Sequence, residues 1–180
     1  MSDIAVVYAS HYGFTETYAR WIAEDLQADL LGSGSVRDLS RYRCVVFGGG
    51  LYAGGVNGIS VLTKNFDRLT NTALFLFTVG AADVTDPENT ASIRRSLARV
   101  LTPPMLERIQ LFHLRGGLRY SQMSLLHRTM MAMLHKKLEK AAPDTLRPED
   151  RMFLETYSRD ISFLDRSSIA PLVEAARRSI

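Results

Sequence analysis

Short apolar runs alternate along this chain with segments of helical periodicity, and this alternation constrains the fold more than any other feature. The runs cover residues 4–8, 44–47, 73–79 and 109–114, with a weaker one at 29–31. Continuous apolar runs suit strands that are covered on both faces. Strands separated by helices of about 10–15 residues indicate crossover connections. The sequence therefore predicts an α/β fold with a doubly wound, five-stranded parallel sheet and helices on both faces.

The helical segments are predicted over residues 15–28, 58–68, 88–101 and 169–178. Pro103 and Pro104 are expected to end the third of these, because proline removes a backbone donor and clashes with the preceding turn. Residues 48–58 contain six glycines and are predicted to form a loop after the strand at 44–47. Cys44 lies within that strand and is interpreted as a packing residue.

Residues 115–165 break the alternation, and we interpret them as a basic helical insertion after the last strand of one domain spanning residues 1–180. A helix is predicted over 123–140, with one apolar face made of Met123, Leu126, Met130, Met133, Leu134 and Leu138. Met-rich faces usually pack in a core, and His127 on this face is interpreted as a core residue. Segment 115–140 carries six basic residues against Glu139 alone. Such a charge attracts anionic ligands, acidic membrane surfaces or acidic partners, although it also suits a solvated helix face.

Three loops that leave predicted strands mark the expected binding site, at residues 9–15, 48–58 and 80–87. In an open α/β sheet the ligand binds beyond the carboxyl ends of the strands, where the strand order reverses. All three loops are rich in small residues. The sequence thus predicts that they meet around one crevice.

The first loop has the composition of a phosphate site. Ser10 and Thr15 supply hydroxyl groups, Gly13 permits a close backbone approach, and a helix N-terminus with free N–H groups follows. The same residues would also serve as ordinary helix caps and a turn. In the second loop Tyr52 lies between glycines and could stack on a planar ligand. The third loop adds backbone groups from residue 80 to Asp83.

The segment Ser10-His11-Tyr12-Gly13-Phe14-Thr15 resembles the phosphate loop of the flavodoxin family, from which it departs at Tyr12, where flavodoxins usually have Thr or Ser. The resemblance implies a flavodoxin-like fold that binds FMN, with the phosphate on residues 10–15 and the isoalloxazine ring near Tyr52 and Ala82. The implied cofactor-binding residues are Ser10, His11, Tyr12, Gly13, Phe14, Thr15, Gly50, Leu51, Tyr52, Ala53, Gly54, Gly80, Ala81, Ala82 and Asp83. A redox partner protein or a small-molecule substrate would exchange electrons with the flavin.

One branch of this family is similar over nearly the whole chain, namely the flavodoxin-domain proteins that resemble bacterial menaquinone-dependent protoporphyrinogen oxidase. The similarity includes Phe112-x-x-x-Gly116-Gly117-Leu118-Arg119-Tyr120, the Met-rich basic helix, and Asp165 before the final helix. It implies oxidation of a porphyrinogen with a quinone as acceptor. The basic, Met-rich segment 115–140 could hold an anionic porphyrin or contact an acidic membrane surface, which would place the protein at the periphery of the inner membrane.

Other readings of the sequence remain open. The chain could be a flavodoxin-fold interaction module without a cofactor. Gly48-x-Gly50-x-x-Ala53 follows a strand like a dinucleotide fingerprint, but further glycines delay the helix that should face the pyrophosphate. A receiver domain would need acidic residues where Ala9, Ser10 and His11 stand. The basic cluster lacks a nucleic-acid motif, so no nucleic-acid partner is expected.

The redox step would belong to the cofactor, so no catalytic acid, base or nucleophile is assigned, and no metal site is predicted. One cysteine, no visible secretory signal and no apolar run of about 18 residues favour a cytoplasmic location. The oligomeric state is not indicated by the sequence.

Overall fold

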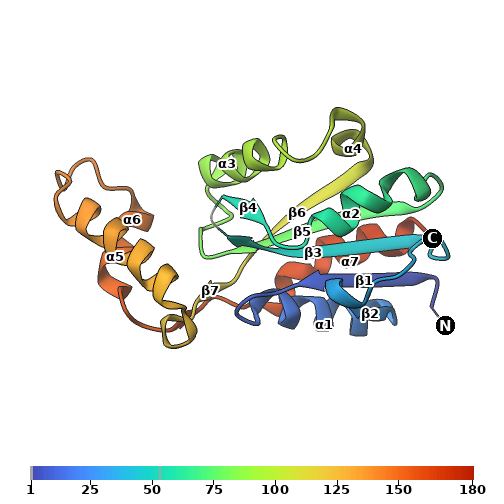
Figure 1. Ribbon diagram of the computed structural model, residues 1–180, viewed down its shortest axis with the longest axis horizontal. Helices are drawn as coiled ribbons and strands as arrows, with labels where there is room; N and C mark the ends of the chain where they lie inside the picture. The colour runs from blue at the N-terminus through green and yellow to red at the C-terminus, as the bar shows by residue number, and fades with distance from the viewer. Residues whose placement is uncertain (1, 53) are drawn as a thin grey trace.

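The computed structural model describes residues 2–52 and 54–180 and has the predicted doubly wound architecture (Figure 1). Five parallel strands lie in the order β2-β1-β3-β5-β6, and a short sixth strand, β4, pairs antiparallel with the end of β3. The strands are β1 (Ile4–Ala9), β2 (Asp29–Gly32), β3 (Cys44–Tyr52), β4 (Gly55–Val56), β5 (Ala73–Gly80) and β6 (Ile109–Arg115).

Helices cover both faces of this sheet (Figure 1). One face carries α1 (Phe14–Leu26) and α7 (Ala170–Arg178). The other carries α2 (Ser60–Asn65), α3 (Pro87–Leu97) and α4 (Pro103–Arg108). Successive residues of a strand point to opposite faces, so Val6 packs toward α1 and α7 while Val7 packs toward α2 and α3. Burial on both faces explains why the strands are continuous apolar runs.

Cys44 is fully buried in β3, as predicted. Burial raises the pKa of its thiol to about 11, because the thiolate would be poorly solvated in this core. The thiol therefore stays protonated at neutral pH and acts as a small apolar side chain.

Strand β3 is longer than predicted, and this corrects the expected loop at 48–58. The strand continues through Gly48, Gly49 and Gly50 to Tyr52 and then turns back into β4. A Cβ atom on Gly48 would lie 2.0 Å from Cζ of Phe77, so glycine is needed here by the packing of the sheet. The predicted helix at 58–68 is likewise shorter, with α2 followed by the 3₁₀ segment Phe66–Arg68.

The two adjacent prolines begin a helix and do not end one. Helix α3 already ends at Leu97, and Pro103 and Pro104 form the first turn of α4. The first turn of a helix leaves its N–H groups without intrahelical partners, so a residue that lacks an N–H is tolerated there.

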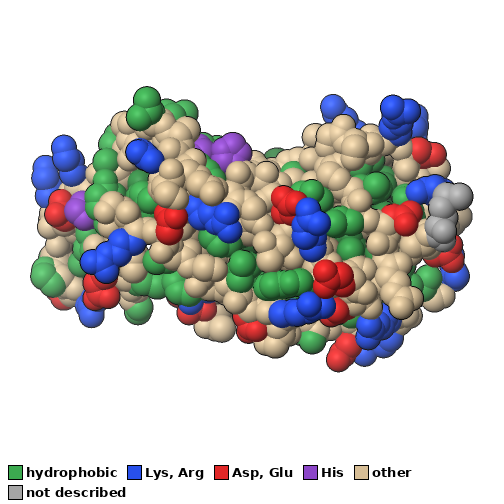
Figure 2. Space-filling model, turned by 90° about the horizontal axis from the view of Figure 1, so that it is seen from below, with side chains coloured by type: hydrophobic (Ala, Val, Ile, Leu, Met, Phe, Trp, Pro, Cys, Tyr) green, Lys and Arg blue, Asp and Glu red, His purple; other side chains and the backbone are tan. Residues whose placement is uncertain are grey.

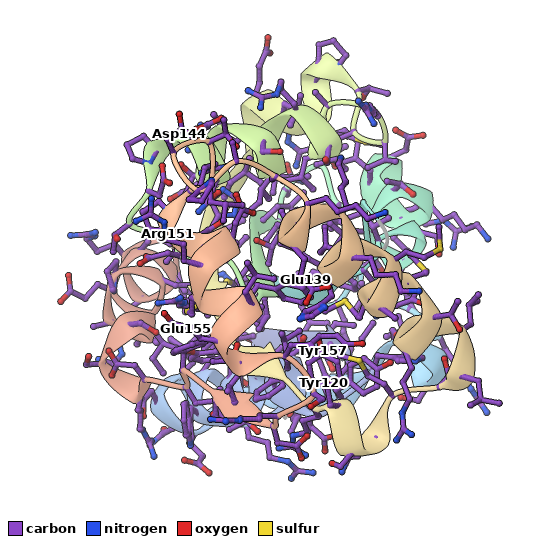
Figure 3. All side chains as sticks on the ribbon, turned by 90° about the vertical axis from the view of Figure 1, so that its left-hand side faces the viewer. Tyr120, Glu139, Asp144, Arg151, Glu155 and Tyr157 are labelled. Carbon is purple, nitrogen blue, oxygen red and sulfur yellow. The ribbon has the colours of Figure 1, made fainter. Side chains whose placement is uncertain are left out.

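Beyond β6 the chain leaves the sheet and forms a helical excursion, residues 117–162, that projects from one end of the molecule (Figure 1). Its elements are β7 (Gly117–Leu118), α5 (Leu125–Glu139), α6 (Pro148–Thr156) and β8 (Ile161–Ser162). Strands β7 and β8 pair antiparallel, so the excursion starts and ends at one place. Ring contacts join its helices: His135 stacks on Tyr157 at 3.9 Å between centroids, and Tyr157 lies edge-on to Tyr120 at 5.6 Å (Figure 3).

The apolar face predicted for this helix is largely exposed, which contradicts its interpretation as core. Leu126 and Met133 are 66% and 67% exposed. The side that packs inward carries His127, Met131 and His135 instead. Hydrophobic periodicity identifies an apolar face but does not say what covers it. None of the described helices is long and apolar enough to cross a bilayer.

Candidate functional site

A cavity of about 340 Å³ opens at the carboxyl ends of β1, β3 and β5. The chain leaves β1 and β3 on opposite sides of the sheet here, which is the usual location of a ligand site in this architecture. The volume is within the range of small-molecule pockets. It is lined by Ser10, His11, Tyr12, Phe14, Thr15, Gly50, Leu51, Tyr52, Asn57, Val79, Gly80, Ala81, Ala82, Gly117, Leu118, Met123, His127, Met130 and Met131. None of the described residues that line the cavity carries a carboxylate group.

The loop between β1 and α1 forms one end of the cavity. Gly13 has φ 87°, a left-handed conformation that favours glycine, and its N–H donates to Ser10 Oγ at 3.0 Å. Helix α1 begins at the next residue, Phe14, and Thr15 is 2% exposed in its first turn. The loop therefore brings two hydroxyl groups to the positive end of a helix dipole, which is a favourable place for a phosphate.

Arg119 adds a positive charge to this end of the site, and the motif analysis did not assign it a binding role. Its guanidinium carbon lies 4.9 Å from the ring centroid of Phe14. Its Nη1 atom would lie 3.5 Å from a Cβ built on Gly13. The signal that could have found it is the concentration of basic residues after β6, but sequence alone did not show that the excursion folds back over this loop.

The end of β3 forms the opposite wall. A Cβ on Gly50 would lie 3.2 Å from Thr15 Oγ1, so the glycine lets this strand approach the first loop closely. The backbone N–H of Asn57 donates to the Gly50 carbonyl at 2.9 Å, and Asn57 lines the cavity, which the sequence analysis did not foresee. Of the remaining predicted residues here, Gly54 does not line the cavity and Ala53 lies outside the described residues.

Four rings gather at the mouth of the cavity. The centroids of Tyr52 and His127 are 4.2 Å apart, and His11 stacks on Tyr52 at 5.5 Å. The Tyr12 hydroxyl is hydrogen bonded to His127 Nδ1. Burial raises the pKa of Tyr12, and burial together with the nearby His11 lowers the pKa of His127. Both side chains of the bonded pair are therefore neutral at pH 7.

The third loop contributes Gly80, Ala81 and Ala82 to the cavity but not Asp83. The Asp83 carboxylate accepts hydrogen bonds from the N–H and hydroxyl of Thr85, which lower its pKa, and it pairs with Arg115 at 3.5 Å. These bonds hold it outside the cavity, where it connects the loop to the end of β6.

The remaining wall comes from the excursion and was not predicted. Gly117 and Leu118 of β7, Met123, and His127, Met130 and Met131 of α5 face the cavity. Methionine is flexible and polarisable, so such a wall can adapt to a flat apolar ligand. The site as a whole offers apolar walls for a ring and a cationic, hydroxyl-rich end for a phosphate. No group of His, Cys, Asp and Glu within the described residues could hold a metal ion.

The family described as Flavodoxin domain matches residues 5–145. Among solved structures, the Trp repressor binding protein from Bacillus subtilis is 10% identical, with a TM-score of 0.46, over 63% of this chain and 82% of that one. A flavoprotein in complex with FMN from Lactobacillus acidophilus is 11% identical, with a TM-score of 0.43, over 64% and 93%. A Fusobacterium nucleatum flavodoxin bound to flavin mononucleotide is 15% identical, with a TM-score of 0.40, over 63% and 69%. No curated protein matched the chain significantly.

Proposed function

The chain belongs to the flavodoxin-domain family, and from that premise we propose that it binds FMN in the cavity and transfers electrons to or from a partner or a small-molecule substrate. The observation that carries this proposal is the combination of an apolar cavity with a hydroxyl-rich helix N-terminus at one end. A flat ring and a phosphate on one molecule would use both parts.

The residues fit such a ligand. Ser10, Thr15 and the backbone N–H groups of the first loop would hold the phosphate, and Arg119 would balance part of its charge. Tyr52 and the small residues Gly80 and Ala82 would flank the ring. The absence of carboxylates among the described lining residues favours an anionic ligand.

FMN would supply the electron-transfer chemistry when bound, so the protein's part is binding, orientation and shielding from water. Leu51, Leu118 and Met131 would exclude water from the ring. The neutral Tyr12–His127 pair would hold α5 against the first loop without placing a charge there. None of these residues is proposed as a nucleophile.

Reconstitution tests the proposal. Purified protein is titrated with FMN, riboflavin and NADH; flavin binding is measured by the quenching of flavin fluorescence and the visible band near about 450 nm, and NADH binding by the change in nicotinamide fluorescence. We expect saturable FMN binding that is tighter than riboflavin binding, because riboflavin lacks the phosphate. An absence of flavin binding would leave the interaction module without cofactor as the better reading, and tighter binding of NADH would favour the dinucleotide fingerprint.

A narrower function, oxidation of a porphyrinogen with a quinone as acceptor, is favoured by the wall that the excursion adds. Met123, Met130 and Met131 extend the apolar surface beyond the three loops. The basic residues of the excursion would suit the carboxylates of a porphyrinogen. An anaerobic assay with protoporphyrinogen and menaquinone tests it: turnover that depends on bound FMN is expected, and a rate no higher than the uncatalysed one would eliminate this function.

A further inference from the structure

Helix α5 presents an exposed apolar stripe that nothing in the described chain covers. Seven large hydrophobic residues are exposed in the described structure, and five of them lie on this one helix. They are Leu125 at 83%, Leu126 at 66%, Met130 at 45%, Met133 at 67% and Leu134 at 41% exposure. A cluster of this kind on a soluble surface marks an interaction site more often than scattered single residues do.

The stripe is continued by positive charge. At 100° per residue, Leu126, Met130 and Met133 fall within about 60° of one another around the helix axis, and Lys137 and Lys140 fall in the same sector. Lys136, Lys137 and Lys140 are all exposed and make no ion pair with another described residue. Figure 2 shows hydrophobic and basic side chains next to one another at the end of the molecule that carries the excursion.

The acidic residue of α5 is kept away from this surface. Glu139 lies on the opposite side of the helix from Leu126 and Met133 by the same wheel. Its carboxylate is within 3.3 Å of His135 Nδ1, on the side that packs toward α6. The sector that contains Leu126, Met130 and Met133 is therefore apolar over the first turns and carries Lys137 and Lys140 in the last, while the exposed Glu139 lies outside it.

We propose that α5 is a membrane-docking helix that lies in the interface of a bilayer containing anionic lipids. Leu125, Leu126 and Met133 would enter the region between headgroups and acyl chains, and Lys136, Lys137 and Lys140 would contact lipid phosphates. Interfacial helices combine these two features, and lysine stems can extend along apolar surface while the ammonium group reaches the headgroups.

Charge decides between a bilayer and a second copy of the chain. A symmetric contact between two α5 helices would cover the apolar stripe, but it would bring two sets of lysines together with no carboxylate on that face to pair with them. An anionic bilayer provides apolar contact and negative charge at once. The docked stripe would adjoin the cavity through Met130, which belongs to both.

Vesicle flotation tests the proposal. Full-length protein is mixed with vesicles of equal parts phosphatidylglycerol and phosphatidylcholine, or of phosphatidylcholine alone, and the floated fraction is measured. We expect binding to the anionic vesicles and at least about ten-fold weaker partitioning to the neutral ones. Failure of the unchanged protein to float with anionic vesicles would overturn the proposal.

Matched variants separate this surface from general effects of charge and hydrophobicity. Leu126→Glu with Met133→Glu should reduce partitioning at least about ten-fold, whereas Val100→Glu on the α3 side of the molecule should not. Replacing Lys136, Lys137 and Lys140 by Gln should have a similar effect on anionic vesicles. The control replaces the exposed Arg94, Arg95 and Arg99 by Gln and removes the same charge.

Two further readouts keep the result interpretable. Leu126 and Met133 do not line the cavity, so FMN titration and circular dichroism should be unchanged in their double variant, and lipid binding is judged independently of flavin binding. Undiminished flotation of the double variant would contradict the proposal. So would self-association of the unchanged protein in sedimentation velocity that the double variant abolishes without any lipid binding, because the occupant would then be a second copy.

Discussion

The Tyr12 hydroxyl and Nδ1 of His127 form a hydrogen bond that joins the loop after β1 to helix α5, across a separation of 115 residues in the chain. Tyr12 is the position where the first loop departs from the usual flavodoxin pattern. The departure therefore has a structural role, since a Ser or Thr would not place a hydroxyl as far from the backbone. The loop has one hydroxyl fewer near the proposed phosphate position and gains a contact that holds the excursion over the cavity.

From this bond we predict that substitutions of Tyr12 and His127 have non-additive effects on the stability of the excursion. Tyr12→Phe and His127→Phe should each destabilise the excursion, and the double variant should cost less than the sum by about 0.5–1.5 kcal/mol, because the second change removes a partner that is already lost. Hydrogen exchange of the α5 amides in the four proteins measures the effect. Strictly additive changes would show that the bond contributes nothing.

From the position of Arg119 we predict that its substitution affects the binding of FMN and the binding of riboflavin differently. Arg119→Gln should weaken FMN binding about ten-fold, since it removes a charge near the proposed phosphate position, but should leave riboflavin binding nearly unchanged. Arg95→Gln, an exposed residue of α3, is the matched control. Equal losses for both flavins would mean that Arg119 shapes the cavity and does not bind the phosphate.

From the close packing around Gly48 we predict that a larger side chain at this position destabilises the sheet. Gly48→Ala places a Cβ 2.0 Å from Phe77 Cζ inside the sheet, so we expect a loss of about 3 kcal/mol in the free energy of unfolding by urea. Phe77→Leu in the same chain should recover part of it. Gly34→Ala is the control, because nothing lies within 4 Å of that Cβ position, and it should change stability by less than about 0.5 kcal/mol.

From the burial of His113 we predict how the stability of the fold depends on pH. Burial, and to a lesser extent Arg94, lower its pKa, and its Nδ1 is bonded to the Thr78 hydroxyl at 2.8 Å. The unfolded chain then binds more protons than the folded one between the lowered pKa and the ordinary value near 6.5, so stability must fall as the pH drops below that value. His113→Leu should flatten the melting temperature between about pH 7.5 and 5.5. His11→Leu, at an exposed position, is the comparison, and an unchanged slope in His113→Leu would contradict this assignment.

The sheet could be predicted from sequence because its strands are buried on both faces and each one is a local apolar run. The residues at which the strands and helices begin and end could not be predicted in this way. Gly48 and Gly50 suggest a loop when the chain is read locally, and only the neighbouring side chains of Phe77 and Thr15 explain why a strand needs glycine there. Pro103 was misread for a related reason, since proline breaks a helix interior but is favoured in a first turn.

The candidate site was predictable where it follows from topology. Loops that leave parallel strands must meet at one edge, and residues such as Ser10, Tyr52 and Ala82 do line one cavity. Met131 and His127 line the cavity, and Arg119 lies beside Gly13, only because the excursion folds back, which no local periodicity encodes. The apolar face of α5 was predicted but its exposure was not, because the pattern of apolar residues is the same whether protein, lipid or water covers it.

The antiparallel pairing of Gly117–Leu118 with Ile161–Ser162 has a consequence for how this scaffold can vary. The polypeptide leaves and rejoins the domain at neighbouring points. The whole intervening segment could therefore be replaced by another without changing the strand pairing of the parallel sheet. A different stretch at this place would leave the parallel sheet and the three loops at its edge intact, while it would replace the wall of the cavity that Leu118, Met123 and Met131 now form.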